Sequence, residues 1–229
     1  MKLQYTHFSD KGPRTNNEDC CGITDIDEHR RMFIVCDGMG GHACGEVASK
    51  TVCDALTSYW KDHPDISDSE QKMLDATKKA SKTLDEKSKM ISMGTTMVMA
   101  SIEGDTAMIA HAGDSRCYVI DLKGNLRYCT KDHVESSALS APYINRAFFS
   151  HQPEKAIPDI KTVKLQPLDR ILLCTDGLYN AIDQETLLHT LQCARDVYQV
   201  AEKFASVCKE RANDNYTAII IEMGLELLK

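Results

Sequence analysis

The sequence predicts a layered α+β protein in which antiparallel sheets are covered by helices. Short β-type runs occur in groups, and helical stretches occur in pairs between those groups. This grouping favours antiparallel sheets with helices on their faces over an alternating βαβ winding. Hydrophobic residues make up 42% of the 229 residues and charged residues 27%, which is ordinary globular usage. The composition therefore excludes a disordered tail, a collagen-like fibre or a coiled-coil rod as the main content.

Strands are expected where short apolar or alternating runs are bounded by turn residues. The Glu103-Gly104-Asp105 and Lys123-Gly124-Asn125 turns divide one region into an antiparallel meander. A short strand is also expected directly after Asp19. The other expected strands are residues 3–8, 31–36, 95–102, 106–111, 116–120, 126–129, 160–165, 170–174 and 216–222.

Helices are expected where apolar residues recur at intervals of three and four. The expected ranges are about 45–60, 69–90, 183–192 and 195–211. The second of these has only a narrow apolar stripe and should lie on the surface. Residues 134–159 carry three prolines and no clear periodicity, so we expect a loop with at most a short helix. No linker divides the chain, which predicts a single domain over residues 1–229.

The charge balance limits the partners that the chain can bind. Lys and Arg total 27 against 34 Asp and Glu, a formal charge of −7. This surplus repels phosphate backbones and anionic lipid, so neither nucleic acid nor a membrane surface is expected as a partner. The 10 cysteines form no Cys-x-x-Cys pair, and no signal peptide or run of about 18 apolar residues is visible. We expect a soluble protein in the reducing cytoplasm.

Aspartates recur at the ends of predicted core strands, several of them beside a glycine. A single Asp-Gly pair is most often a turn, but a set of such sites is hard to explain by turns alone. Carboxylates gathered at one sheet edge would repel each other by about 4 kcal/mol per pair at about 4 Å and an effective dielectric near 20. A native state keeps such a cluster only if cations neutralise it. The aspartates are Asp19, Asp37, Asp114, Asp176 and Asp214.

These residue types indicate metal-assisted phosphate hydrolysis. Oxygen ligands without cysteine suit hard ions such as Mg²⁺ or Mn²⁺. Two such ions can activate a shared water against a phosphorus centre. Arg14 lies just before Glu18 and Asp19 and offers the bidentate fork that phosphate recognition needs, although a surface cation is the alternative interpretation.

The same residues carry a family resemblance that covers the chain from Phe8 to Ile221. The chain resembles the metal-dependent protein phosphatases, the type 2C serine/threonine phosphatases, and the glycine-rich motif after Asp37 is similar to that of their compact bacterial branch. Six motifs occur in the family order: Arg14-x-x-Asn17-Glu18-Asp19, Asp37-Gly38-Met39-Gly40-Gly41-His42, Gly94-Thr95-Thr96, Ala112-Gly113-Asp114-Ser115-Arg116, Thr175-Asp176-Gly177-Leu178 and Asp214-Asn215-x-Thr217.

The resemblance implies a four-layer α-β-β-α sandwich with two antiparallel sheets packed face to face. It also implies two tightly bound Mn²⁺ or Mg²⁺ ions and a third, weaker one. A metal-bridging water would attack the phosphate directly, with no covalent phospho-enzyme. The resemblance implies that Asp37 bridges two metals, that the Gly38 carbonyl binds one of them and that Asp176 and Asp214 bind the other. Glu18 and Asp19 would bind or orient metal-bound waters, and Asp114 would bind the third metal together with Asp176. Arg14 would bind the phosphate.

His42 has two interpretations. Other branches of the family carry a histidine directly after the Asp-Gly, proposed as the general acid, whereas this chain has Met39 there. His42 either substitutes as the acid or caps the following helix.

The resemblance predicts an active phosphatase that acts on phosphorylated proteins, opposes a serine/threonine kinase and is monomeric. Family members carry a longer flap after the Asp132-His133 pair, so residues 134–159 are expected to be a shortened flap with altered specificity. A hydrolase of small phosphate esters is an alternative that would share the centre. A phosphoprotein-binding pseudophosphatase is disfavoured, because Arg14 and all five aspartates are present.

Overall fold

The strands of the protein form two large antiparallel sheets. A computed structural model describes residues 3–27, 29–39, 44–89, 91–137 and 140–225. In the first sheet the order is β1 (Leu3–Asp10), β14 (Tyr216–Met223), β13 (Arg170–Cys174), β7 (Arg116–Ile120) and β8 (Leu126–Cys129). In the second it is β11 (Phe148–Phe149), β4 (Gly94–Thr95), β3 (Arg30–Met39), β5 (Met97–Glu103), β6 (Thr106–Ala112) and β12 (Asp159–Lys164), with β2 (Asp19–Asp25) also paired to β3.

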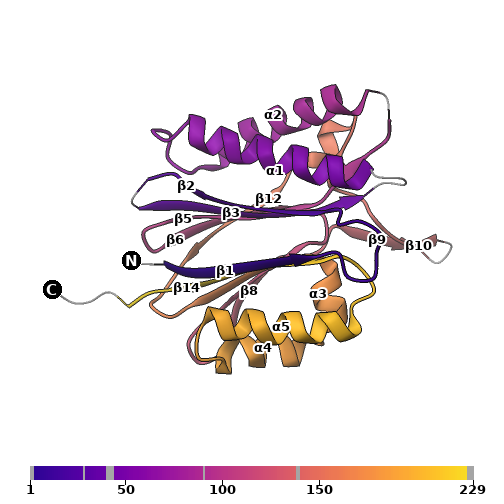
Figure 1. Cartoon of the computed structure of the whole chain (residues 1–229). Coiled ribbons are helices and arrows are strands. Elements are labelled where there is room, and N and C mark those ends of the chain that lie inside the picture. The colour runs from indigo at the N-terminus through magenta and orange to yellow at the C-terminus, as the bar shows by residue number, and fades with distance from the viewer. Residues whose placement is uncertain (1–2, 28, 40–43, 90, 138–139, 226–229) are drawn as a thin grey trace.

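Helices cover the outer face of each sheet, as Figure 1 shows. The second sheet is covered by α1 (Cys44–Asp62) and α2 (Glu70–Ser88). The first is covered by α3 (Asp176–Ala181), α4 (Gln184–Cys193) and α5 (Val197–Arg211). The predicted α-β-β-α sandwich is thereby confirmed for the described part of the chain.

Alternation along the strands divides the core into layers. In β3, Met32, Ile34 and Cys36 pack against α1 and α2, whereas Phe33 and Val35 point into the space between the sheets. Successive side chains of a strand point to opposite faces, so a continuous apolar run fits a strand that is buried on both sides. Each fully buried side chain of this size stabilises the fold by about 1.5–3 kcal/mol. This is why the predicted core strands are runs of hydrophobic residues.

Polar caps set the beginnings of three helices. The Ser69 hydroxyl accepts a hydrogen bond from the Lys72 backbone N–H at the start of α2. Asp183 and Asp196 do the same for α4 and α5, accepting from the N–H groups of Thr186 and Gln199. Each cap satisfies a backbone donor that the helix leaves unpaired, which is why such residues favour this position. The predicted surface helix α2 is confirmed, and it buries its narrow stripe against α1.

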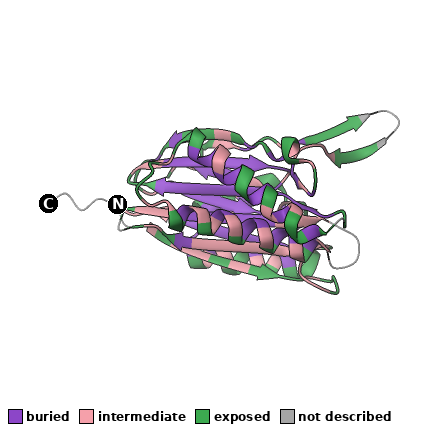
Figure 2. Ribbon diagram, turned by 90° about the horizontal axis from the view of Figure 1, so that it is seen from above, coloured by how far each residue is buried: buried purple, intermediate pink, exposed green. Residues whose placement is uncertain are grey.

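Residues 134–159 do not form the predicted loop, and that prediction was wrong in part. β9 (Val134–Ser137) and β10 (Ser140–Ile144) pair as an antiparallel hairpin, and β11 and a 3₁₀ turn (Pro153–Ala156) follow. Figure 2 shows the hairpin extending beyond the sandwich with mostly exposed residues. A ribbon that packs on no core needs no apolar alternation, so its pattern carried no strand signal.

Three further differences concern the ends of strands. β3 continues past Asp37 to Met39, because Gly38 and Met39 pair with β4. Asp19 is the first residue of β2 rather than the residue before it, and the short helix α3 begins directly at Asp176. In the described part of the chain, no helix combines the length and apolar character needed to span a membrane.

Candidate metal centre

The sandwich brings the five predicted aspartates to one end of its two sheets. Asp19 and Asp37 lie directly opposite each other on the paired strands β2 and β3. Asp176 begins α3, immediately after β13 of the other sheet, and Asp214 lies in the turn before β14. Asp114 lies in the turn between β6 and β7. Because β13 and β14 are neighbours and both sheets end here, residues almost 200 positions apart share one site.

The carboxylates are close enough to change one another's protonation. Asp37 and Asp176 are close enough that each side chain alters the pKa of the other. Burial raises the pKa of Asp37 well above its usual value, and the charges of Asp19, Asp176, Asp114 and Asp214 raise it further. Acids held this close cannot all ionise without a cation, which is the condition expected of a metal site.

The same effect extends to Asp19 and Asp114. Burial raises the pKa of Asp19 to about 7, against hydrogen bonds from Thr217 and Thr175 that lower it. Burial and then the charge of Asp176 raise the pKa of Asp114 to about 6. Burial and the charge of Asp214 likewise raise the pKa of Asp176.

One of the two carboxylate oxygens of Asp19 has no hydrogen-bond partner. Its Oδ2 accepts a hydrogen bond of 2.9 Å from the Thr175 hydroxyl, whereas its Oδ1 is buried without a partner. A buried carboxylate oxygen without a donor is costly, and a cation or a cation-bound water satisfies it. The described acids that meet here offer only oxygen donors, so they fit Mg²⁺ or Mn²⁺ and not a thiolate-seeking ion.

Asp37 is held through its backbone. Its N–H donates to the Thr96 hydroxyl at 3.0 Å, and its carbonyl accepts from the Thr96 N–H at 2.9 Å and from the Thr95 hydroxyl at 2.8 Å. Both threonines are fully buried. These contacts use the backbone of Asp37 and leave its carboxylate to face the other acids.

Gly38 and Gly45 allow the strand end, the start of α1 and Glu18 to meet closely. A Cβ on Gly38 would collide with the carbonyls of Gly45 and Glu18, and a Cβ on Gly45 would collide with the Glu18 carboxylate. Glycine is required where backbones approach this closely. The Glu18 side chain therefore lies against the first turn of α1, beside the strand end that carries Asp37.

Arg14 lies at the rim of the site. Its Nη2 donates to Asp214 Oδ2 at 2.6 Å, and its Nε donates to the Asn213 carbonyl at 3.2 Å. The side chain is 56% exposed, and its charge partly offsets the effect of the acids on the pKa of Asp176. The guanidinium is thus bound to one of the carboxylates while most of it stays open to solvent.

Sequence reasoning gave Asn215 no role of its own, although it belongs to a quoted motif. Its side chain accepts from the Glu18 N–H at 2.8 Å and donates to the carbonyls of Lys11 and Asn16. One buried amide thereby ties the turn at Asp214 to the segment that carries Arg14 and Glu18. Its place directly after Asp214 was the only signal in the sequence.

The predicted site residues are therefore brought together, with one exception. His42 lies outside the described residues. The other predicted residues all lie at this end of the sheets: Arg14, Glu18, Asp19, Asp37, Gly38, Asp114, Asp176 and Asp214.

The chain is similar in sequence to known protein phosphatases. Residues 9–215 match the protein phosphatase 2C family. The serine/threonine phosphatase Stp of Listeria welshimeri is 28% identical, over 93% of this chain and 92% of that protein. The serine/threonine protein phosphatase PstP of Mycobacterium tuberculosis is 31% identical, over 97% of this chain and 45% of that protein.

Solved structures give the same relation. The Mycobacterium tuberculosis phosphatase PstP superposes with a TM-score of 0.83 at 28% identity, over 97% of this chain and 99% of that one. A structure of the PstP catalytic domain in complex with two manganese ions has a TM-score of 0.81 at 29% identity, with the same coverage. Since the family match spans most of the sequence, the chain belongs to the protein phosphatase 2C family.

Proposed function

We propose that this protein is a metal-dependent protein phosphatase that hydrolyses phosphoserine and phosphothreonine. The observation that carries the proposal is the acidic cluster, in which Asp19 and Asp37 lie opposite each other on paired strands, Asp176 and Asp214 raise the pKa of Asp37, and Asp19 Oδ1 is buried without a partner. Its relatives Stp and PstP are serine/threonine phosphatases, which supports the same substrate class.

We assign two tightly bound ions to this cluster, manganese or magnesium. Asp37 would bridge them, the Gly38 carbonyl would bind one, and Asp176 and Asp214 would bind the other. When bound, these cations would supply a coordinated water of lowered pKa and would offset the charge of a phosphate. The two manganese ions of the PstP catalytic domain support this choice of metal.

The other acids have supporting roles in this proposal. Glu18 and Asp19 orient metal-bound waters, consistent with the buried Asp19 oxygen that lacks a donor. Asp114, whose pKa is raised by burial and then by Asp176, contributes with Asp176 to a third and weaker ion. The crowding of these carboxylates is what such ions would relieve.

Arg14 would bind the phosphate oxygens. It is exposed and adjoins the acids, so it can attract an anion that the carboxylates alone would repel. A planar guanidinium matches two phosphate oxygens at once. Protonation of the leaving alcohol by His42 remains a prediction from the sequence.

The hairpin β9–β10 takes the place of a flap in this proposal. The hairpin starts directly after His133, which is bound to Gly113 beside Asp114, and it is short, so the cleft would be open to a bulky phosphoprotein or to a lid supplied by a partner. Grafting a longer flap in place of residues 134–144 should change the preference among phosphopeptides. Unchanged relative rates across a peptide panel would contradict this role.

The decisive experiment measures hydrolysis of p-nitrophenyl phosphate with and without Mn²⁺. We expect activity only with the metal, and a loss of at least about 100-fold in Asp37→Asn and in Asp176→Asn. Asp65→Asn, at an exposed aspartate, is the matched control and should retain activity. Full activity without metal or in either site variant would overturn the two-metal mechanism.

Two other functions share parts of this geometry, and the same assays separate them. A hydrolase of small phosphate esters would turn over the nitrophenyl ester far better than phosphopeptides. A pseudophosphatase would bind phosphopeptides without turning over either substrate.

We further propose that the enzyme is a cytoplasmic monomer that opposes a serine/threonine kinase. Light scattering after gel filtration tests the monomer, and a mass twice that of the 25.6 kDa chain would contradict it.

A further inference from the structure

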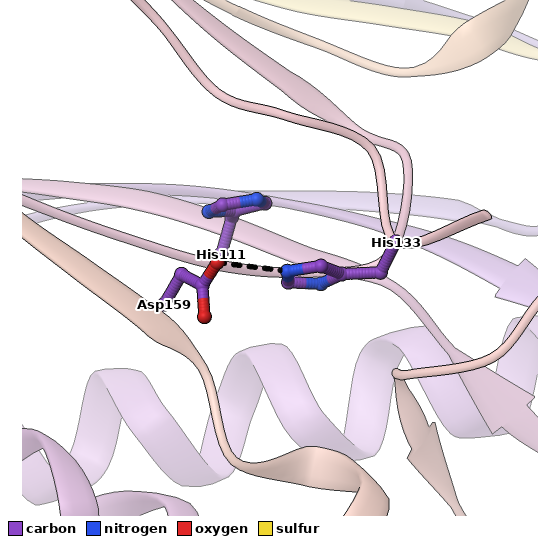
Figure 3. A group of neighbouring side chains, drawn as sticks. All are labelled: His111, His133 and Asp159. Carbon is purple, nitrogen blue, oxygen red and sulfur yellow. Dashed lines mark hydrogen bonds and ion pairs between the residues drawn. The ribbon is translucent and has the colours of Figure 1, made fainter. Parts of the chain in front are cut away.

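Three residues beside the acidic cluster form a second polar group, shown in Figure 3. His111 on β6 pairs in register with Asp159 on β12, and His133 follows β8. Their nitrogen and carboxylate atoms lie within 4.8 Å of one another. The two imidazole rings are stacked, with centroids 4.5 Å apart and planes inclined by only 12°. Ring nitrogens bind a metal in the plane of the ring, so nearly parallel rings cannot both direct a lone pair at one ion. The hydrogen bonds of the group therefore indicate another role.

His133 makes two hydrogen bonds to the backbone of Gly113, which together are called the His133 grip. The His133 backbone N–H donates to the Gly113 carbonyl at 2.9 Å. The Gly113 N–H donates to Nδ1 of the His133 ring at 3.2 Å. The backbone donor and the backbone acceptor of Gly113, the residue just before Asp114, are thus both bound by one residue.

Asp159 fixes the tautomer that this grip requires. Its Oδ2 lies 3.1 Å from His133 Nε2, and its Oδ1 accepts from Arg146 Nη2 at 2.8 Å. A carboxylate paired with arginine can only accept, so Nε2 must carry the proton. A backbone N–H can only donate, so Nδ1 must offer its lone pair. Burial lowers the pKa of His133, which favours the neutral ring that this arrangement needs.

Gly113 connects this group to the acidic cluster. It has a φ of +119°, and a Cβ there would collide with Thr96. The Thr96 hydroxyl bonds to that of Ser115 at 2.6 Å and accepts from the Asp37 N–H. The other side of the turn is held by Tyr179 on α3, whose hydroxyl donates to the Asp114 carbonyl at 3.1 Å. Without His133, the Gly113 side of the Asp114 turn would lose the hydrogen bonds that His133 makes to the Gly113 N–H and carbonyl.

We infer that His133 is a positioning residue for Asp114, and that Asp159 acts through it by fixing its tautomer. The inference rests on the proposed function for what Asp114 then does. His133 itself would touch neither substrate nor metal. Neighbouring groups that orient a ligand are commonly worth 10- to 100-fold in metal affinity or activity.

A pair of substitutions separates the two hydrogen bonds of the ring. Asparagine places its side-chain oxygen where Nδ1 stands, so His133→Asn retains the acceptor for Gly113. Glutamine reaches the position of Nε2, so His133→Gln retains contact with Asp159 and loses that acceptor. Asp159→Ala removes the tautomer control. Asp105→Ala is its matched control, since Asp105 lies in the turn just before β6 and binds Lys164, the last residue of β12, instead.

Three measurements test the inference. We expect His133→Gln to lower kcat about tenfold and to raise the Mn²⁺ concentration for half-maximal activity, while His133→Asn and Asp105→Ala stay within about threefold of wild type. Hydrogen exchange of the Gly113 amide should accelerate in His133→Gln and in Asp159→Ala but not in His133→Asn. The ¹⁵N spectrum of the wild-type ring should show Nδ1 unprotonated.

Equal losses in both His133 variants with unchanged Gly113 exchange would overturn the inference. So would a wild-type ring protonated at Nδ1, a result that needs no variant to fold. If no form hydrolyses any phosphoester, the proposed function fails by itself, because amide exchange and the ring tautomer are measured without turnover.

Discussion

Single residues of the acidic cluster lower the stability of the fold by repelling one another, and the same residues are the proposed metal ligands. Asp37 is held by three backbone hydrogen bonds to Thr95 and Thr96, yet its carboxylate faces other acids. The backbone contacts and the strand pairing with β2 keep it in place despite the repulsion. A site poised for cations is therefore expected to be strained without them.

Asp37→Asn should stabilise the metal-free protein, because it removes a charge from a crowded and partly buried group. We expect a gain of about 1 kcal/mol in the free energy of unfolding, measured by denaturant titration in EDTA at pH 8. The exposed control Asp65→Asn should change it by less than about 0.5 kcal/mol. A loss of stability in Asp37→Asn would show that the acids do not repel one another.

Arg14 should affect the binding of substrate more than the stability of the protein, since its side chain is 56% exposed. Arg14→Ala is expected to raise KM for a phosphopeptide about tenfold, and Arg14→Lys to restore only part of this, because lysine lacks the planar fork. An Arg14→Ala enzyme with an unchanged KM would exclude the phosphate role.

Asp114→Ala should reduce turnover while leaving the two tight ions bound. Asp114 is reached from the turn between β6 and β7, whereas Asp37, Asp176 and Asp214 come from other segments. Calorimetric titration with Mn²⁺ should therefore still give two tight sites. Loss of those sites as well would refute a separate third site.

The elements that meet at the centre depend on close approaches that only glycine allows. α3 begins right after β13, and Gly177 in its first turn lies against the carbonyl of Asn215. This contact joins the helix that carries Asp176 to the turn that carries Asp214. The relative position of two proposed ligands is thus decided by the packing of one element against another.

Gly177→Ala should destabilise the protein by about 2 kcal/mol and lower activity beyond what the loss of folded protein explains. The added methyl would collide with Asn215 and push apart two segments of the centre. Gly104→Ala is the control, because its φ of +60° costs about 1 kcal/mol but the space around it is open. Chemical denaturation gives the free energy of unfolding of both variants, and an activity assay gives their turnover. If Gly177→Ala has the same stability and turnover as Gly104→Ala, the close packing at Gly177 is contradicted.

On the scale of the whole molecule, the acidic surplus has a specific place. The formal charge is −7, and five of the aspartates behind it gather at one end of the sandwich. The bare chain should therefore repel phosphate, whereas the loaded centre should attract it. Folding and metal binding should therefore be coupled through this cluster.

Mn²⁺ should raise the melting temperature by roughly 5–10 °C at about 100 times its dissociation constant, since such binding adds about 2.7 kcal/mol. Thermal unfolding in Mn²⁺ and in EDTA at equal ionic strength measures the shift. It should be lost in Asp176→Asn. An equal shift in that variant would mean that the metal binds elsewhere.

Local pattern was sufficient to predict the layers of the fold. Strands such as residues 170–174 and 216–222 are apolar on both faces because both faces are buried, and this can be seen in any window of the chain. The extension of β3 to Met39 could not be seen in this way, since it depends on pairing with β4. The hairpin β9–β10 was missed because backbone pairing without a buried face leaves no pattern in the sequence.

The sequence by itself determined the α+β layering and which carboxylates and arginine could form a phosphatase centre. Only the tertiary structure decided what holds them. Asn215 joins Glu18 across 197 positions, Thr175 joins Asp19 across 156, and the grip of His133 on Gly113 depends on Asp159. Alternation and motif order are properties of short windows, whereas a hydrogen bond between distant residues depends on the register and packing of whole sheets.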